Sequence, residues 1–136
     1  MANTLQLEIV TPEEKIYSEE VEMVTLPGSE GELGIYPNHV QLMTQVHAGE
    51  IIVNRGGIEE VLAVGEGFIE VTGDHVSILT ENAVNSANID EAAADQARRR
   101  AEDRLKEGDI SEEEAKALNQ AILYSAAQIK AKRRRG

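Results

Sequence analysis

The sequence predicts a β-sandwich or β-barrel domain followed by an antiparallel pair of α-helices. In residues 1–86, short stretches alternate apolar and polar side chains, and turn residues separate them at intervals of roughly 8–12 residues. After residue 86, Val, Ile, Thr and Gly give way to Ala, Glu, Arg and Lys. Two helix-start signals follow that change. We therefore expect two domains, residues 1–86 and residues 87–136.

The strand predictions begin with Leu5, Leu7 and Ile9, whose polar neighbours indicate a strand with one buried face. A second strand is expected over residues 21–26. Further strands are predicted over residues 41–46, 51–54, 59–64, 68–71 and 76–79. No helix-length segment lies between these stretches, which argues against a parallel α/β sheet.

The first helix is predicted over residues 88–107. Asn88 is a suitable N-cap, and Glu91 lies three residues further on, as in a capping box. Gly108 can adopt the backbone conformation that ends a helix.

The second helix is predicted over residues 111–133, because Ser111 and Glu114 form a capping box. The connection is short, so the two helices must be antiparallel neighbours. The contact between them is rich in alanine and supplies only about a few kcal/mol. The residues expected there are Ala93, Ala97, Ala101, Leu105, Ala115, Leu118, Ile122, Ala126 and Ile129. Such a hairpin either packs on the sandwich or detaches, and the sequence leaves both possibilities open.

Charge is distributed unevenly along the chain, whose net charge is −12. Residues 1–97 hold 18 acidic and 2 basic side chains, whereas residues 98–136 hold 7 acidic and 11 basic ones. The acidic part argues against nucleic-acid binding, which needs Lys and Arg to contact phosphate. The basic part could meet an acidic partner surface.

Several kinds of chemistry find no support in the sequence. The chain has no cysteine, which excludes disulfides, thiolate metal sites and cysteine nucleophiles. The histidines His39, His47 and His75 fall on different predicted elements, so neither a zinc site nor a catalytic triad is expected. We expect no catalytic residue, no metal site, no signal peptide and no membrane-spanning helix, since no apolar run approaches about 20 residues.

The segment 28–39, with the sequence GSEGELGIYPNH, has glycines at intervals of three followed by Pro37 and His39. This composition predicts an irregular loop. A dinucleotide-binding loop needs G-x-G-x-x-G opening a helix after a strand. Here the spacing differs, no helix follows, and Glu30 and Glu32 would repel phosphate.

This segment resembles the signature of the epsilon subunit of F-type ATP synthases, which is called delta in mitochondria. The resemblance extends in order over nearly the whole chain. It includes Val10-Thr11-Pro12, Glu22-Met23-Val24, Gly65-Glu66-Gly67-Phe68-Ile69-Glu70-Val71, His75-Val76-Ser77-Ile78-Leu79 and Ile89-Asp90-Glu91-Ala92.

The resemblance implies a ten-stranded β-sandwich with a two-helix hairpin, acting as a non-catalytic subunit in the central stalk of a proton-translocating ATP synthase. The implied partners are the gamma subunit, the ring of c subunits and the alpha/beta catalytic hexamer. Membrane association would come only through this complex, at the cytoplasmic face of the bacterial plasma membrane. The residues that match the c-ring and gamma interface are Gly31, Glu32, Gly34 and His39.

The resemblance also implies a regulatory role for the hairpin. In the family, basic side chains of an extended hairpin meet an acidic loop of the beta subunit and inhibit ATP hydrolysis. The candidates for that contact here are Arg98, Arg99, Arg100, Lys130, Lys132, Arg133 and Arg134.

Some family members bind ATP through an I-D-x-x-R-A motif and arginines on the second helix. Ile89, Asp90 and Arg100 match that set, whereas Ala93, Gln120 and Tyr124 stand where arginines are needed. Arginine forks are the usual means of holding a polyphosphate. We therefore expect weak or no ATP binding and no cofactor. A free-standing ATP-sensing module is the alternative function, and a hydrolase or metalloenzyme is a third for which no constellation of residues is present.

Overall fold

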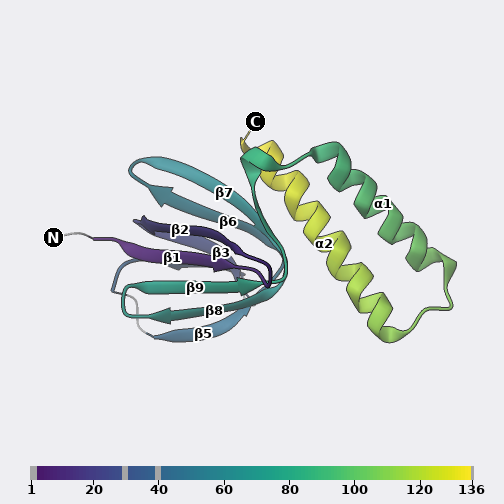
Figure 1. The fold of residues 1–136 in the computed structure, drawn as a ribbon, viewed down its shortest axis with the longest axis horizontal. Coiled ribbons are helices and arrows are strands. Elements are labelled where there is room, and N and C mark those ends of the chain that lie inside the picture. The colour runs from purple at the N-terminus through teal and green to yellow at the C-terminus, as the bar shows by residue number, and fades with distance from the viewer. Residues whose placement is uncertain (1–2, 29–30, 39–40, 136) are drawn as a thin grey trace.

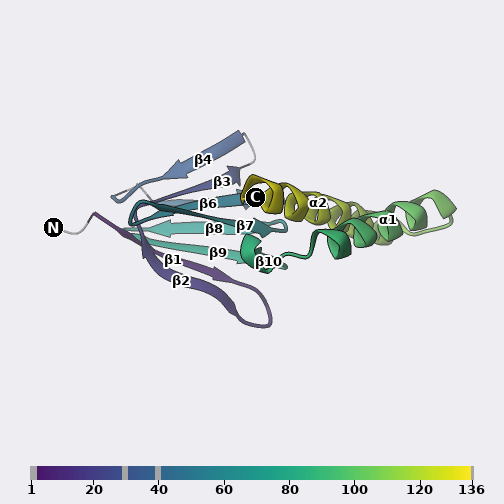
Figure 2. The ribbon, with the colours of Figure 1, turned by 90° about the horizontal axis from the view of Figure 1, so that it is seen from above.

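The computed structural model describes residues 3–28, 31–38 and 41–135. Within these residues, ten strands precede two long helices, and the helices extend from one end of the strand domain (Figures 1 and 2). This arrangement confirms the predicted fold class. The strands are β1 (Leu5–Val10), β2 (Lys15–Val21), β3 (Met23–Gly28), β4 (Gly31–Ile35), β5 (Leu42–Val46), β6 (Gly49–Arg55), β7 (Ile58–Val64), β8 (Gly67–Thr72), β9 (His75–Thr80) and β10 (Ala83–Asn85).

The strands form one hydrogen-bonded sheet that folds over on itself. Its order is β10-β7-β6-β3-β5-β8-β9-β1-β2, with β4 paired to β3 outside this path. The two halves of the sheet meet where Gly28 of β3 pairs with Val46 of β5. Strands β1 and β9 run parallel. The sheet therefore encloses a core between two layers, like a sandwich.

The core consists mainly of Val, Ile and Leu side chains from both layers. Leu5, Leu7 and Ile9 alternate inward and are fully buried, as the sequence predicted. The strand predicted over residues 21–26 is wrong as a single element. The chain turns between Val21, which ends β2, and Met23, which begins β3.

A side-chain network joins β2 to β6 and β7 beside the main pairing path. The Tyr17 hydroxyl donates a hydrogen bond to Glu60 Oε1 at 2.8 Å, and Arg55 Nε donates to the same oxygen at 3.2 Å. Arg55 Nη1 also lies 3.4 Å from Glu19 Oε1. Burial, followed by the hydrogen bond to Glu60, raises the pKa of Tyr17 well above its usual value. This network helps close the sandwich along the β2 edge.

A Tyr17→Phe variant should lose about 0.5–1.5 kcal/mol of unfolding free energy, because it removes one partly buried hydrogen bond and keeps the ring. Urea unfolding followed by circular dichroism measures this loss. The matched control is Tyr36→Phe, since Tyr36 is exposed. An equal loss in both variants would contradict a role for Tyr17 in closing the sandwich.

The helical part begins with a short 3-10 turn at Ser86–Asn88 (η1), followed by α1 (Glu91–Glu107) and α2 (Glu112–Arg135). The N-cap of α1 is Asp90, not Asn88, and its side chain accepts a hydrogen bond from the Ala93 N–H at 3.1 Å. Asn88 is wrong as the cap because it lies inside η1.

Two further helix boundaries confirm the sequence analysis. Gly108, at φ 72°, ends α1. The Ser111 hydroxyl accepts a hydrogen bond from the Glu114 N–H at 3.0 Å, at the start of α2.

Helix α2 packs on the sandwich, and α1 packs on α2 (Figures 1 and 2). Ala127 and Ala131 of α2 are buried against Val61 and Ala63 of β7. Ala93 and Ala126, which the sequence placed in the contact between the helices, are exposed. The prediction that these two alanines are buried between the helices is wrong. The alanines of α2 that are buried, Ala127 and Ala131, face the sheet instead.

Candidate functional site

The glycine-rich segment forms a β-hairpin, not the irregular loop predicted from its composition. Strand β4 contains Gly31, Glu32 and Gly34, and it pairs with β3 from Val24↔Ile35 to Gly28↔Gly31. Glycine usually weakens a strand, but the regular pairing with β3 overrides that preference here. Gly31, at φ 111°, has a conformation that favours glycine. Glu32 and Gly34 are exposed.

The two ends of this segment lie at opposite ends of the sheet. Glu32 pairs with Pro27 at the end where β3 meets β5. At the other end, the Asn38 N–H donates a hydrogen bond to Asp74 Oδ1 at 2.8 Å, in the turn between β8 and β9. His39 lies outside the described residues. The structure therefore separates Glu32 from the Asn38 side of the segment.

The basic residues at the middle of α1 make ion pairs within that helix. Arg98 contacts Asp95 and lies 2.9 Å from Glu102, and Arg99 lies 3.0 Å from Asp95. The hydrogen bond to Asp95 is the main cause that raises the pKa of Arg98 above its usual value. Arg99 and Arg100 are exposed.

The basic residues near the end of α2 contact acidic residues on other elements. Arg133 Nε lies 3.0 Å from Glu91 of α1. Arg134 and Lys130 both contact Glu50, at the start of β6. The hydrogen bond to Glu50 is the main cause that raises the pKa of Arg134. Lys132 is half-buried on the same helix.

A cavity of about 600 Å³ between the helices brings the two basic clusters together. Its wall contains Arg98 from α1 and three basic residues from α2, with Asp95 as the acidic member. The lining residues are Asp95, Arg98, Ala126, Ile129, Lys130, Arg133 and Arg134. Four of the seven regulatory candidates thus share one surface.

The three nucleotide candidates do not line this cavity. Ile89 is buried in the apolar cluster between β7 and α2, and Asp90 caps α1. Arg100 lies on α1 and is exposed. Ile89 and Asp90 therefore have structural roles in the docked hairpin.

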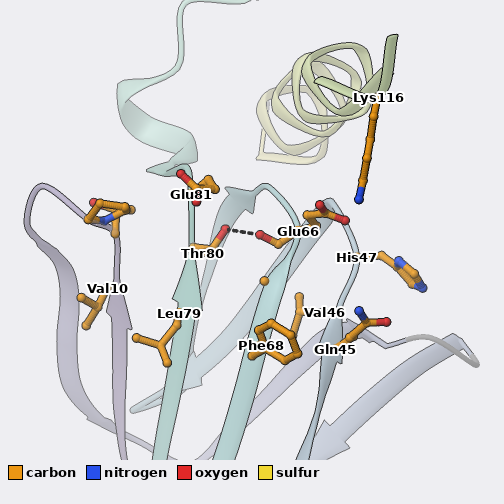
Figure 3. Close-up of a pocket in the computed structure, with 13 residues that line it drawn as sticks. Val10, Gln45, Val46, His47, Glu66, Phe68, Leu79, Thr80, Glu81 and Lys116 are labelled. Carbon is orange, nitrogen blue, oxygen red and sulfur yellow. Dashed lines mark hydrogen bonds between the residues drawn. The ribbon is translucent and has the colours of Figure 1, made fainter. Parts of the chain in front are cut away.

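A second cavity, of about 580 Å³, lies between α2 and the end of the sandwich. Figure 3 shows Lys116 extending from α2 toward Glu66 and His47. The Thr80 hydroxyl lies 2.9 Å from the Gly65 carbonyl oxygen and 3.2 Å from that of Glu66, which fixes the turn before β8. Phe68 and Leu79 line the cavity and form a cross-strand pair.

The outer face of β5, β8 and β9 exposes large apolar side chains. Phe68 and Leu79 are each 53% exposed, and Met43 of β5 is 68% exposed. Glu70 pairs with Met43 and lies on the same face. An apolar surface of this kind, bordered by polar groups, is typical of a protein–protein contact.

Sequence reasoning missed Glu50 and the surface that α2 covers. The sequence signal for the covered surface was the apolar run Val61-Leu62-Ala63-Val64, which is buried throughout. A continuous apolar run indicates a strand covered on both faces. Leu62 and Val64 face the core between the layers, whereas Val61 and Ala63 face α2.

The comparisons with known proteins agree with this architecture. The family model described as "ATP synthase, Delta/Epsilon chain, beta-sandwich domain" matches residues 4–86. The ATP synthase epsilon chain of Magnetococcus marinus is 37% identical over 131 residues, which cover 96% of this chain and 96% of the relative. The epsilon chain of Herminiimonas arsenicoxydans is 41% identical over 132 residues, which cover 93% of this chain and 94% of the relative.

The chain belongs to the family of ATP synthase epsilon chains.

Epsilon chains are non-catalytic subunits of the ATP synthase, and the similarity of this chain to them extends beyond the sandwich. The family model ends at residue 86, but the two relatives above also cover the helical hairpin. A further epsilon chain, from Pelotomaculum thermopropionicum, is 44% identical over 102 residues, or 75% of this chain and 76% of that relative.

Two solved structures are similar to this epsilon chain. One is a chain in the mitochondrial ATP synthase of Euglena gracilis, determined with OSCP, F1 and c-ring. It has a TM-score of 0.76 and 25% identity, over 96% of this chain and 82% of that chain. The other is a chain in the central stalk and c-ring of Tetrahymena thermophila mitochondrial ATP synthase. It has a TM-score of 0.61 and 13% identity, over 94% of this chain and 96% of that chain. The latter supports the fold alone.

Among the described residues, neither helix of this epsilon chain is both long and apolar enough to cross a membrane.

Proposed function

We propose that this epsilon chain couples rotation of the c-ring and the gamma subunit to ATP synthesis in a proton-translocating F-type ATP synthase, and that its hairpin inhibits ATP hydrolysis. The observation that carries the regulatory part is the cavity between the helices. It gathers Arg98, Lys130, Arg133 and Arg134 on one surface. A concentrated set of cations favours an acidic partner.

The sandwich, residues 1–86, is the rotor-docking domain in this proposal. Gly31, Glu32, Gly34 and His39 contact the polar loops of the c-ring. The exposed apolar face that contains Met43 and Phe68 suits the gamma subunit, because burying such a face favours a lasting contact. Membrane association at the cytoplasmic face of the bacterial plasma membrane follows from these contacts.

The hairpin, residues 87–136, is the regulatory domain. When it leaves the sandwich, its basic side chains meet an acidic surface of the beta subunit in the alpha/beta hexamer. Arg99, Arg100 and Lys132 add to the four cations of the cavity. Screening by salt should weaken such a contact.

Deleting residues 88–136 should raise ATP hydrolysis by the reassembled complex several-fold, because the inhibitory segment is gone. The measurement is ATPase rate with and without the deletion, at equal occupancy of the epsilon chain. A full-length companion carries Arg98→Gln, Arg99→Gln and Arg100→Gln and should show part of the same rise. Unchanged hydrolysis in both variants would refute inhibition by the hairpin.

A pull-down from membranes tests the stalk assignment separately. The full-length chain should recover the gamma, beta and c subunits. The Glu32→Lys variant should recover less c subunit and unchanged gamma subunit. Recovery of the epsilon chain alone would contradict the proposed place in the complex.

A further inference from the structure

Glu50 is a carboxylate on the outer face of β6 whose side chain is only 7% exposed. Arg134 of α2 contacts it through two hydrogen bonds, Nε to Oε2 at 2.8 Å and Nη2 to Oε1 at 3.2 Å. Lys130 Nζ lies 3.6 Å from Oε1. A single buried carboxylate of the sandwich therefore binds two cations, one helical turn apart, at the end of α2.

These contacts differ from the other ion pairs of the hairpin. The pairs of Arg98, Arg104 and Arg133 join groups within the hairpin and would move with it. Among the described residues, the ion pairs between the hairpin and the sandwich all end on Glu50. An arginine fork on a carboxylate is among the stronger charge-assisted contacts. Here the Glu50 side chain is largely buried, whereas Arg134 and Lys130 reach it from the solvent-exposed side of α2.

The apolar contact beside Glu50 is made on α2 mainly by small side chains, with Tyr124 packed partly buried against the same cluster. Ala63 pairs with Glu50 in the sheet, and it packs with Ala127 and Ala131 of α2 in the same cluster. Alanine side chains bury little apolar area and allow only a close backbone approach. Small side chains allow a helix to slide more easily than interlocking large ones do, so the charged contact at Glu50 adds specificity to the docking.

Glu50 also favours one position of α2 along its axis. A nearly buried carboxylate without its cations is costly, so an α2 shifted along its axis would leave Glu50 unpaired. Ala131, between Lys130 and Arg134 in the sequence, is fully buried on the same helix, so this contact and the alanine contact hold the same part of α2. The carboxylate thus fixes the position of the helix as well as its attachment.

We propose that Glu50 is the acceptor of a charge latch that holds α2 on the sandwich through Arg134 and Lys130, and that a carboxylate-rich surface releases the hairpin by competing for these two cations. The latch is a property of the free chain. The competition deepens the proposed inhibitory function and rests on it. In the docked state, the cations that would bind the partner are already occupied.

Distances between two spin labels, measured by double electron–electron resonance on the full chain, test the latch. The sequence has no cysteine, so Thr72→Cys on the sandwich and Glu107→Cys at the end of α1 can carry two spin labels. Both positions are exposed. The labelled protein should show one narrow distance distribution at low salt. Adding Glu50→Gln should lower the docked-to-released ratio about 10-fold or more, because a charge-assisted contact is lost.

Two further variants control this experiment. Glu70→Gln removes the same charge from an exposed position on the other layer and should leave the distances unchanged. Arg134→Gln breaks the latch from the helix side and should reproduce the effect of Glu50→Gln even if the latter impairs folding of the sandwich. Unchanged distances in Arg134→Gln, or equal release in Glu70→Gln, would overturn the latch.

The competition is tested on the same labelled chain with poly-glutamate as the probe. At equal ionic strength, poly-glutamate should release the hairpin more than sodium chloride does. The excess effect should disappear in Arg134→Gln, which lacks the main cation. Equal effects of poly-glutamate and sodium chloride would refute the competition and leave the latch intact. Both the latch test and the competition test are read from distances, so their outcomes do not depend on ATPase activity.

Discussion

The Gly67→Ala substitution should be among the most destabilising single substitutions in this epsilon chain. Gly67 begins β8 and pairs with Thr80 of β9. A Cβ atom at this position would lie 1.9 Å from the backbone carbonyl oxygen of Leu79. Because the obstacle is backbone rather than a flexible side chain, the two strands must separate. We expect a loss of about 3–5 kcal/mol in unfolding free energy, at the upper end for point mutants.

The measurement is the thermal midpoint by calorimetry, where each kcal/mol corresponds to about 2–8 °C. Gly65→Ala is the matched control, since it lies two residues away and its Cβ would be 3.6 Å from the nearest atom, an ordinary contact. The control should change the midpoint little. A Gly67→Ala midpoint equal to that of the control would show that β8 and β9 are not held this closely.

An Ala131→Leu variant should release the hairpin while leaving the sandwich folded. Ala131 is fully buried in the cluster that α2 forms with Val61 and Ala63 of β7, so a leucine at this position has to displace its neighbours. Overpacking costs about 1–3 kcal/mol. The chain can avoid that cost by undocking α2, so the docking free energy should fall by this amount. Spin-label distances between the sandwich and the tip of the hairpin measure the released fraction.

The control for this variant is Ala121→Leu on the exposed face of α2. It makes the same chemical change, and the docked fraction should stay at the wild-type value. In the reassembled complex, Ala131→Leu should also lower ATP hydrolysis, because the inhibitory hairpin is released more often. A variant that stays docked would mean that the sheet can move to accept the leucine.

Much of the fold was accessible from the sequence because burial alternates along most strands. Leu5, Leu7 and Ile9 illustrate this pattern. Strand β2 was not predicted from the sequence. Most of its residues, including Glu19 and Glu20, are exposed at an edge of the sheet, so its apolar and polar residues do not alternate clearly. Its place depends on pairing with β1, which local sequence does not encode.

Strand β4 and the orientation of α2 were missed for related reasons. The glycines of β4 weaken local strand preference, and only the register with β3 determines the hairpin. Alanine occurs on several faces of α2, so periodicity alone could not show that Ala127 and Ala131 face the sheet while Ala126 does not.

The candidate site, like the fold, was only partly predictable from the sequence. The matching interface residues, such as Glu32, came from resemblance to a family and not from spacing. The basic clusters were visible in the sequence, but their acidic partner was not. Glu50 and Arg134 are 84 residues apart, and nothing local to either residue indicates the other.

The alanine face of α2 has a thermodynamic consequence for the docked hairpin. Releasing α2 exposes the apolar outer surface of Ile52, Val61 and Ala63 to water. Newly hydrated apolar area gives release a positive heat capacity, so the docking free energy is a curved function of temperature with a maximum. The attachment of the hairpin therefore weakens on cooling as well as on heating.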